Sequence, residues 1–188
     1  MKKIILASNS PRRRELLSGL GYTYEVRVLK GIDESYPTSL RGSEVASYIS
    51  RAKADAYRAT MAEDELIITA DTIVCLDDQV LGKPADEAEA IAMLRSLSGR
   101  THQVYTGVTI LTAEASSTFV SCSDVTFATL TDEEIHHYVT QYRPMDKAGA
   151  YGIQEWIGYI GVERIEGSYF NVMGLPVQRL YTELKKYL

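Results

Sequence analysis

The chain has 188 residues, of which 45% are hydrophobic and 24% are charged, as is typical of a globular protein that buries its own core. The formal net charge of −5 argues against broad binding to nucleic acid or to an anionic membrane, so a polyanionic ligand would have to meet a local cluster of positive charge. The apolar run after Lys3 is too short for a signal sequence or a membrane span. Cys75 and Cys122 both lie in strand-like runs, and we expect two buried free thiols in a cytoplasmic protein.

Hydrophobic periodicity predicts strands and helices that alternate along the chain. In chain order, the expected elements are a strand at 3–8, a helix at 11–20, a strand at 23–28, a helix at 43–58, a strand at 66–76, a helix at 86–97, antiparallel strands at 104–111 and 118–128, a helix at 132–141, a strand at 158–165 and a helix at 176–187. Loops are expected at 30–42 and 142–156. This order predicts an α/β fold, a mixed sheet flanked by helices, in one domain over residues 1–188.

The first strand–turn–helix unit carries the strongest chemical signal. Ser10 suits the N-cap of the helix, and Pro11 suits its first position. Arginines occupy positions 12–14, in the first turn, where the helix dipole disfavours cations. We therefore expect an anion there, although a solvated basic turn is the plain alternative. At about 100° per residue the three arginines cannot all face one ligand, and we expect Arg14 to point elsewhere.

Carboxylates provide the second signal. Asp71 interrupts an apolar strand, where a charge is costly unless it is paired or bound to a metal; alternatively, the strand ends at Ala70 and resumes after a turn. Asp33 and Glu34 are adjacent acids in a loop, which are usually solvated. If the fold brings one of them near Asp71 without a basic partner, the two carboxylates would suit Mg²⁺ or Mn²⁺.

Two lysines have both an ordinary and a functional interpretation. Lys53 lies at the edge of the buried stripe of its helix, from which it could extend to solvent or reach a ligand. Lys83 stands between Gly82 and Pro84 in a turn that suits a phosphate contact, but no glycine-rich P-loop precedes it. The three histidines lack metal-ligand spacing.

Eight ordered blocks of the sequence match a known family. The blocks are LASNSPRRRELL (6–17), RAKADA (51–56), ITADTIV (68–74), LGKPAD (81–86), LSGRTHQVYTGV (97–108), DVTFATLT (124–131), DKAGAYGIQ (146–154) and GSYFNVMGLP (167–176). With them the chain resembles the Maf family of nucleoside triphosphate pyrophosphatases over its entire length. The resemblance implies hydrolysis of a nucleoside triphosphate to a monophosphate and pyrophosphate, with a divalent cation (Mg, Mn or Co). It also implies an elongated, two-lobed fold like that of inosine triphosphate pyrophosphatases, with a central cleft, and a homodimer.

Carried over residue by residue, the resemblance makes Asp71 the proton acceptor and Glu34 its metal-binding companion. It implies triphosphate contacts by Ser8, Arg13, Lys53 and Lys83. It places Arg12, Thr72 and Gln154 at the positions that set base specificity in the subgroup acting on dTTP and UTP. The chain is thus expected to act on these nucleotides, with a house-cleaning role towards non-standard nucleotides.

Two other classes of function are compatible with parts of the sequence. A non-catalytic nucleotide-binding regulatory module could use the same pocket, but it would have no need of carboxylates beside phosphates. An RNA-binding accessory protein would explain the arginine run, but the acidic net charge counts against it. Pyrophosphate release would separate the enzyme from both alternatives.

Overall fold

The computed structural model describes residues 2–188, which form one mixed α/β structure. Its strands are β1 (Lys3–Leu6), β2 (Tyr24–Val26), β3 (Glu65–Leu76), β4 (Gln79–Leu81), β5 (Thr101–Leu111), β6 (Ser116–Phe127) and β7 (Val162–Glu166). Its helices are α1 (Pro11–Ser18), α2 (Ser43–Asp55), α3 (Glu87–Leu97), α4 (Asp132–Tyr142), the 3₁₀ turn η1 (Ala148–Ala150), α5 (Trp156–Gly161), α6 (Tyr169–Met173) and α7 (Val177–Leu184).

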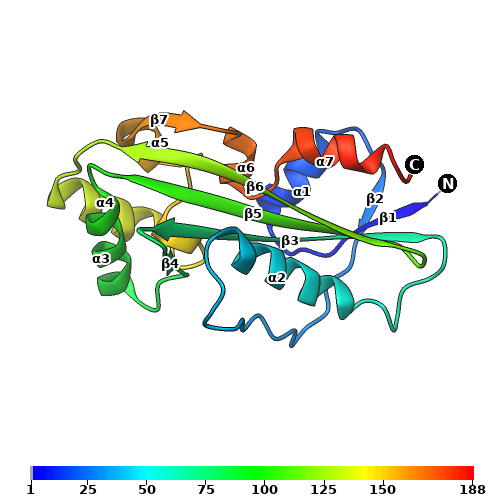
Figure 1. The fold of residues 1–188 in the computed structure, drawn as a ribbon. Coiled ribbons are helices and arrows are strands. Elements are labelled where there is room, and N and C mark those ends of the chain that lie inside the picture. The colour runs from blue at the N-terminus through cyan, green and yellow to red at the C-terminus, as the bar shows by residue number, and fades with distance from the viewer. Residues whose placement is uncertain (1) are drawn as a thin grey trace.

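Within residues 2–188 the strands form one seven-stranded sheet in the order β2-β1-β3-β5-β6-β7, with β4 paired to part of β3. The pairs β1–β2 and β1–β3 are parallel, and the remaining pairs are antiparallel. The long strands β3, β5 and β6 run through an elongated molecule, and helices gather near both of its ends (Figure 1). The mixed sheet flanked by helices that the sequence predicted is therefore confirmed.

Alternation along the strands directs side chains to helices on opposite faces of the sheet. Leu66 and Ile68 of β3 pack in one core cluster with leucines of α1 and α7, whereas Ile67 packs with Ala54 of α2. At the other end of the sheet, α3 and α4 bury their apolar faces in a third cluster around Phe127. These clusters fix β3 between two sets of helices (Figure 1).

Helix α2 lies unusually close to the sheet because of one glycine. Gly107 of β5 is paired with Asp71 of β3, and a β-carbon at Gly107 would overlap the carbonyl group of Ala46. Only glycine leaves room for a helix backbone at this distance. The close approach brings the last turn of α2, which carries Lys53, over the middle of β3.

Most predicted elements are present, and their caps are as expected. Ser10 caps α1 with Pro11 at its first position, Asp86 caps α3, and Thr131 forms a capping box with Glu134 at α4. Strand β3 continues without a break through residue 71, so the alternative in which it ends at Ala70 is wrong.

Other predictions need correction. The strand expected at 158–165 is instead α5 followed by β7, because glycines allow tight coiling: a β-carbon at Gly158 would overlap the carbonyl of Ile153. Helix α2 ends three residues earlier than expected, at Asp55, and α7 ends at Leu184. The short elements β4, η1 and α6 were missed, and each lies near the cleft described below.

The two cysteines differ in exposure. Cys75 is buried as predicted, but Cys122 is exposed, which corrects the expectation of two buried thiols. Cys122 occupies an outward position of β6, where the inward positions are Phe119, Ser123 and Val125. Within residues 2–188, no helix is long and apolar enough to cross a membrane.

Candidate functional site

A cleft made of two adjoining chambers lies beside the middle of β3. The sheet chamber, about 420 Å³, is lined by β3 residues 71–74, Val104, Tyr151 and Gln154, and the turn chamber, about 510 Å³, is lined by residues 7–13, the 28–34 loop and Tyr57. Both volumes are in the range of small-molecule sites. The chambers share a set of mostly charged residues at their junction: Ser10, Arg12, Arg13, Glu34, Lys53, Lys83 and Asp146.

The turn between β1 and α1 lines the turn chamber. The Ser8 hydroxyl accepts a hydrogen bond from the Ser10 N–H at 3.1 Å, and the Ser10 hydroxyl accepts one from the Arg13 N–H at 3.4 Å. These bonds use hydroxyl lone pairs and leave both hydroxyl protons free to be donated. The helix N-terminus and the two hydroxyls thus form a site that favours an anion.

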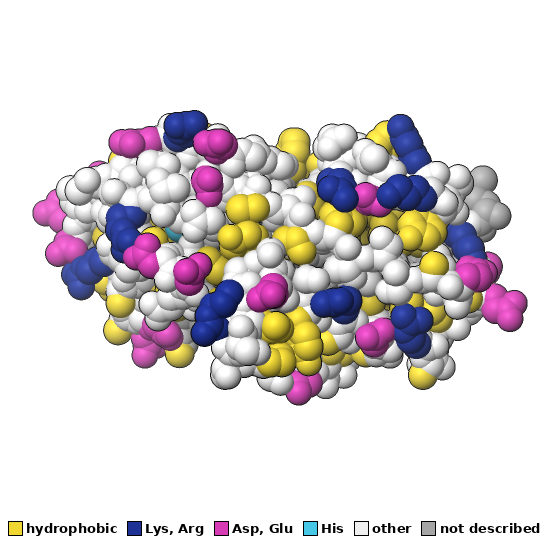
Figure 2. All heavy atoms as spheres, in the orientation of Figure 1, with side chains coloured by type: hydrophobic (Ala, Val, Ile, Leu, Met, Phe, Trp, Pro, Cys, Tyr) yellow, Lys and Arg dark blue, Asp and Glu magenta, His cyan; other side chains and the backbone are white. Residues whose placement is uncertain are grey.

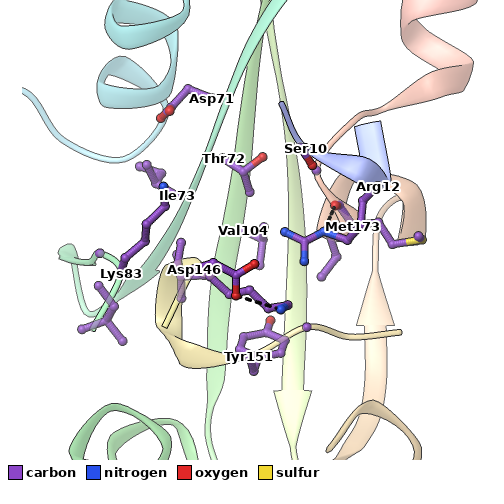
Figure 3. Close-up of a pocket in the computed structure, with 18 of the residues that line it drawn as sticks. Ser10, Arg12, Asp71, Thr72, Ile73, Lys83, Val104, Asp146, Tyr151 and Met173 are labelled. Carbon is purple, nitrogen blue, oxygen red and sulfur yellow. Dashed lines mark hydrogen bonds and ion pairs between the residues drawn. The ribbon is translucent and has the colours of Figure 1, made fainter. Parts of the chain in front are cut away.

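Two of the three arginines of α1 reach the same segment at the end of α6, and the third turns away. Arg12 Nε donates to the Met173 carbonyl at 3.2 Å (Figure 3), and Arg13 Nε donates to the Gly174 carbonyl at 2.8 Å. Arg14 turns away, with its Nη2 donating to Asn9 Oδ1 at 3.2 Å, as the helical spacing predicted. Burial lowers the pKa of the Arg13 guanidinium, while the nearby Asp71 carboxylate raises it; an arginine stays charged under such shifts.

Lys53 lies between the two carboxylates that the sequence singled out. Its Nζ is 2.9 Å from Asp71 Oδ1 and 3.0 Å from Glu34 Oε1. Its side chain is only 16% exposed, so it does not extend to solvent. Asp33 accepts instead from the N–H of Ser35, which leaves Glu34 as the acid that faces the cleft. The carboxylates do converge, but with a basic partner between them, contrary to the condition set from sequence.

Much of the positive charge at the junction is not held in an ion pair by residues 2–188. Among residues 2–188, neither Arg12, Arg13 nor Lys83 forms an ion pair with a carboxylate. Lys83 is exposed and extends from the loop after β4 into the cleft (Figure 3). A junction with three cations outside any ion pair is suited to a ligand with several negative charges.

The far end of the sheet chamber combines apolar side chains with polar groups, among them Asp146 beside Tyr151 (Figure 3). Tyr151 lies at the opposite end of the close-up from Asp71, with Thr72 and Val104 between them (Figure 3). The Tyr151 hydroxyl is 2.6 Å from Nε2 of the fully buried His102. Gln154 also lines this chamber, and its buried Oε1 has no hydrogen-bond partner among residues 2–188. An apolar wall that also carries a few polar groups is typical of a surface that recognises a flat, polar-edged ring.

Sequence reasoning missed several residues of this cleft. Met173 and Gly174, whose carbonyls hold the arginines, and Asp146, Lys147 and Tyr151 all lie in the last two matched blocks, which were used only for the resemblance. Backbone carbonyl acceptors cannot be recognised in a sequence, because every residue carries one whatever its side chain. The signal that could have found them is the density of Gly and aromatic residues in both blocks.

Asn171 attaches the carbonyl-bearing segment to the sheet. Its buried Nδ2 donates to the Val104 carbonyl at 3.1 Å and to the Ser123 hydroxyl at 3.0 Å. Three residues later, Gly174 has a φ of 119°, which an L-residue rarely adopts, and its carbonyl accepts a hydrogen bond from Arg13. The end of α6 is thus fixed in position against β5 and β6.

The carboxylate pair also fits a hard divalent cation. Both carboxylates already converge on one positive group, Lys53 Nζ. Within residues 2–188 no three His, Cys, Asp or Glu side chains are grouped to hold a metal by themselves. A cation held by one or two carboxylates plus ligand phosphates, as is common for Mg²⁺, fits this donor set.

Comparison with known proteins identifies the family to which the chain belongs. The family model described as Maf-like protein matches residues 3–187. The chain belongs to the Maf-like protein family. Maf-like relatives named dTTP/UTP pyrophosphatase are 66% identical in Phocaeicola vulgatus and 63% identical in Bacteroides thetaiotaomicron, in each case over 98% of this chain and 95% of the relative. A relative of the same name in Porphyromonas gingivalis is 56% identical, over 98% of this chain and 94% of its own length.

The Maf-like fold is shared with a solved structure of low sequence similarity. A HAM1 protein from Coxiella burnetii superposes with a TM-score of 0.53 at 16% identity, covering 99% of this chain and all of that one. The likeness concerns the fold alone.

Proposed function

We propose that this Maf-like protein hydrolyses dTTP and UTP to the nucleoside monophosphate and pyrophosphate. One observation carries the proposal: Arg12, Arg13 and Lys83 converge on the junction of the cleft without a carboxylate partner among residues 2–188. A triphosphate carries close to four negative charges at neutral pH and would supply the missing counter-charge. The names of the three relatives supply the class of nucleotide.

The two chambers suit the two parts of such a substrate. The turn chamber, with Ser8 and the N-terminus of α1, suits the polyphosphate tail, and the sheet chamber, with its apolar wall, suits the nucleoside. The α-phosphorus links the two parts and would therefore lie at the junction, beside Lys53 and Asp71. This placement favours cleavage between the α- and β-phosphates over loss of the terminal phosphate.

Asp71 is the proposed proton acceptor. A water oxygen forms a bond to the α-phosphorus, and the bond from that phosphorus to the α–β bridging oxygen breaks. The electron pair of the broken bond leaves with pyrophosphate, and the proton of the attacking water passes to the Asp71 carboxylate. Lys53 and Arg13 would hold the phosphate oxygens in place while negative charge moves onto the leaving group.

A divalent cation (Mg²⁺, Mn²⁺ or Co²⁺) would be held by Asp71 and Glu34 together with phosphate oxygens. When bound, it supplies charge neutralisation and a water of lowered pKa. Lys53 would then release one of its two carboxylates to the cation. Binding of Mn²⁺ in the presence of a non-hydrolysable nucleotide, followed by electron paramagnetic resonance, tests this assignment: Glu34→Gln and Asp71→Asn should each weaken it.

Base selection is assigned to Arg12, Thr72 and Gln154. The Gln154 amide offers one donor group and one acceptor, which suit the O4 and N3–H edge of uracil or thymine. Its Oε1 is buried without a partner among residues 2–188, and rotation of the amide toward the chamber would give it one in such a ring. We further propose a cytoplasmic homodimer with a house-cleaning role against non-standard pyrimidine nucleotides; light scattering after size exclusion tests the dimer.

The RNA-binding alternative is not favoured by the surface. Acidic and basic side chains are interspersed over the face seen in Figure 2, whereas an RNA-binding face would gather basic residues. The non-catalytic alternative is disfavoured by the carboxylates of Asp71 and Glu34 beside the expected phosphates, which they would repel unless they act on them.

A product-resolved panel tests the function. The protein is incubated with Mg²⁺ and dTTP, UTP, CTP, ATP or GTP, and pyrophosphate and inorganic phosphate are quantified separately. We expect pyrophosphate from dTTP and UTP, less from CTP and little from the purines. Inorganic phosphate as the first product would contradict the reaction type, and equal rates on ATP and dTTP would contradict the base assignment.

A further inference from the structure

A chain of hydrogen bonds connects the cleft to the buried face of β5. Arg13 Nη2 is 3.0 Å from Thr72 Oγ1, Thr72 Oγ1 is 2.8 Å from Thr106 Oγ1, and Thr106 Oγ1 is 3.1 Å from the Asn171 carbonyl oxygen. Thr72 lines the sheet chamber, whereas Thr106 is fully buried and does not line it. The pairing of Thr72 with Thr106 in the register of β3 and β5 holds the two hydroxyls together.

The direction of every bond in this chain follows from its two ends. A guanidinium can only donate, so Thr72 Oγ1 accepts from Arg13, and a carbonyl can only accept, so Thr106 donates its single proton to Asn171. Thr106 Oγ1 then accepts the proton of Thr72. Reversing the central bond would cost the bond from Thr106 to the Asn171 carbonyl, which would keep only its bond from the Gly174 N–H at 3.0 Å. The assigned direction therefore makes one more hydrogen bond than the reverse.

The consequence lies at the surface of the chamber. Thr72 has given its only proton to Thr106 and has received one from Arg13, so it faces the cleft with one remaining lone pair. It can accept a hydrogen bond from a ligand but cannot donate one. Gln154 differs, because its amide can rotate by 180° and exchange donor for acceptor.

We propose that Thr106 is a positioning residue for base selection, which fixes the Thr72 hydroxyl as an acceptor toward the ligand. Such a site favours a ring that presents an N–H, as uracil and thymine do at N3, over cytosine, which presents an unprotonated nitrogen there. The inference rests on the proposed function and adds to it the group that rejects CTP. A buried group of fixed polarity rejects a mismatched partner because one of the two is left unpaired.

The test is the ratio of kcat/KM for UTP to that for CTP. Thr106→Val keeps the shape of the side chain but removes the acceptor, which frees the Thr72 proton for cytosine. We expect this ratio to fall roughly tenfold, the size of effect that one buried hydrogen bond can have on discrimination. Thr106→Ser, which restores the hydroxyl, should restore the ratio.

A matched control separates positioning from a general packing defect. Thr109 is another fully buried threonine of β5, bonded to Ser50 and Thr118 and not to any residue of the cleft. Thr109→Val should lower the melting temperature without changing the ratio. If Thr106→Val does not fold, Thr106→Ala also lacks the hydroxyl and is measured in its place.

The outcomes are distinct. A fallen ratio in Thr106→Val, with rescue by serine and no change in Thr109→Val, supports the inference. If the wild-type protein prefers UTP and Thr106→Val has the same ratio, the inference is overturned and the proposed function stands. A wild-type protein that releases no pyrophosphate from UTP overturns the proposed function, and the inference with it.

Discussion

The two chambers of the cleft achieve specificity by opposite means. At the junction with the turn chamber, charges are abundant, and Lys53 pairs with both Asp71 and Glu34. At the far end of the sheet chamber, the polar groups are few and fixed, as in the pair of Tyr151 with His102. The comparison indicates that the charged end would bind any triphosphate, whereas the fixed end would distinguish one base from another.

The largest expected effect is at the charged end. Asp71→Asn should lower kcat on the order of 10² or more for every nucleotide alike, because a residue that accepts the proton and holds a cation acts on the shared phosphates. The fold should persist, since Lys53 keeps Glu34 as a partner. Asp33→Asn is the matched control, because Asp33 bonds Ser35 outside the cleft. Near-normal turnover of Asp71→Asn would exclude the assigned role, and a collapsed melt would make the residue structural.

Substitution of the arginines tests which of them contact the phosphates and which influence the choice of base. Arg13→Ala should lower kcat/KM about tenfold to a hundredfold, equally for dTTP, UTP and CTP, as expected for a charge-assisted bond to phosphate. Arg12→Ala should also change the ratios between these nucleotides. Arg14→Ala is the control, because its guanidinium turns to Asn9. Damage by Arg14→Ala equal to that of Arg13→Ala would show that α1 presents a different face to the substrate.

Gln154 tests the opposite end. Gln154→Leu should lower kcat/KM for UTP and for CTP by roughly tenfold each, because an amide that can rotate to pair with either ring edge is lost. Inhibition by inorganic tripolyphosphate, which has no base, should be unchanged. A large change in that inhibition constant would mean that Gln154 contacts phosphate and that the ends of the cleft are misassigned.

Substitution of His102 should have the smallest effect on turnover near neutral pH. It should have a clear effect on the pH dependence of stability. Burial lowers its pKa to about 4, below the value of about 6.5 for an unfolded chain. The unfolded state therefore binds the proton first, and the free energy of unfolding should decrease as the pH falls from about 6.5 to about 4, by about 3 kcal/mol in all. Denaturant titrations across this range should show the slope, and His102→Gln should lack its contribution; an unchanged slope would contradict a neutral, buried imidazole.

The sequence predicted the charged end better than the fixed end for a physical reason. Ser8, Arg13, Asp71 and Lys83 are unusual in their local patterns: charges in a strand, in a first helical turn or between Gly and Pro. Tyr151 is different, because a buried aromatic residue looks like any other core residue until the fold shows that one side of it lines a cavity. The tertiary contacts of α6 could not be predicted, since its arginine acceptors are carbonyls.

The helices were predicted correctly where they have N-caps, which are local signals. The prediction failed where the space around a glycine decided the structure. Asp86 and Thr131 mark their helices in any context. Gly158 allows a helix in a β-branched, aromatic stretch because it has no β-carbon, which would collide there with the Ile153 carbonyl. The placement of α2 over Gly107 is likewise a tertiary property that no periodicity contains.

The position of Asp71 in the middle of a twelve-residue strand also has a kinetic consequence. Its neighbours Ala70 and Thr72 are paired with β5, so the backbone beneath the carboxylate cannot open without disrupting the ladder between β3 and β5. Amide hydrogens in this segment should exchange with solvent deuterium only through unfolding of the sheet as a whole. Any opening and closing that admits a nucleotide would then take place in the surrounding loops. The backbone that carries Asp71 would stay fixed while the substrate moves into position beside it.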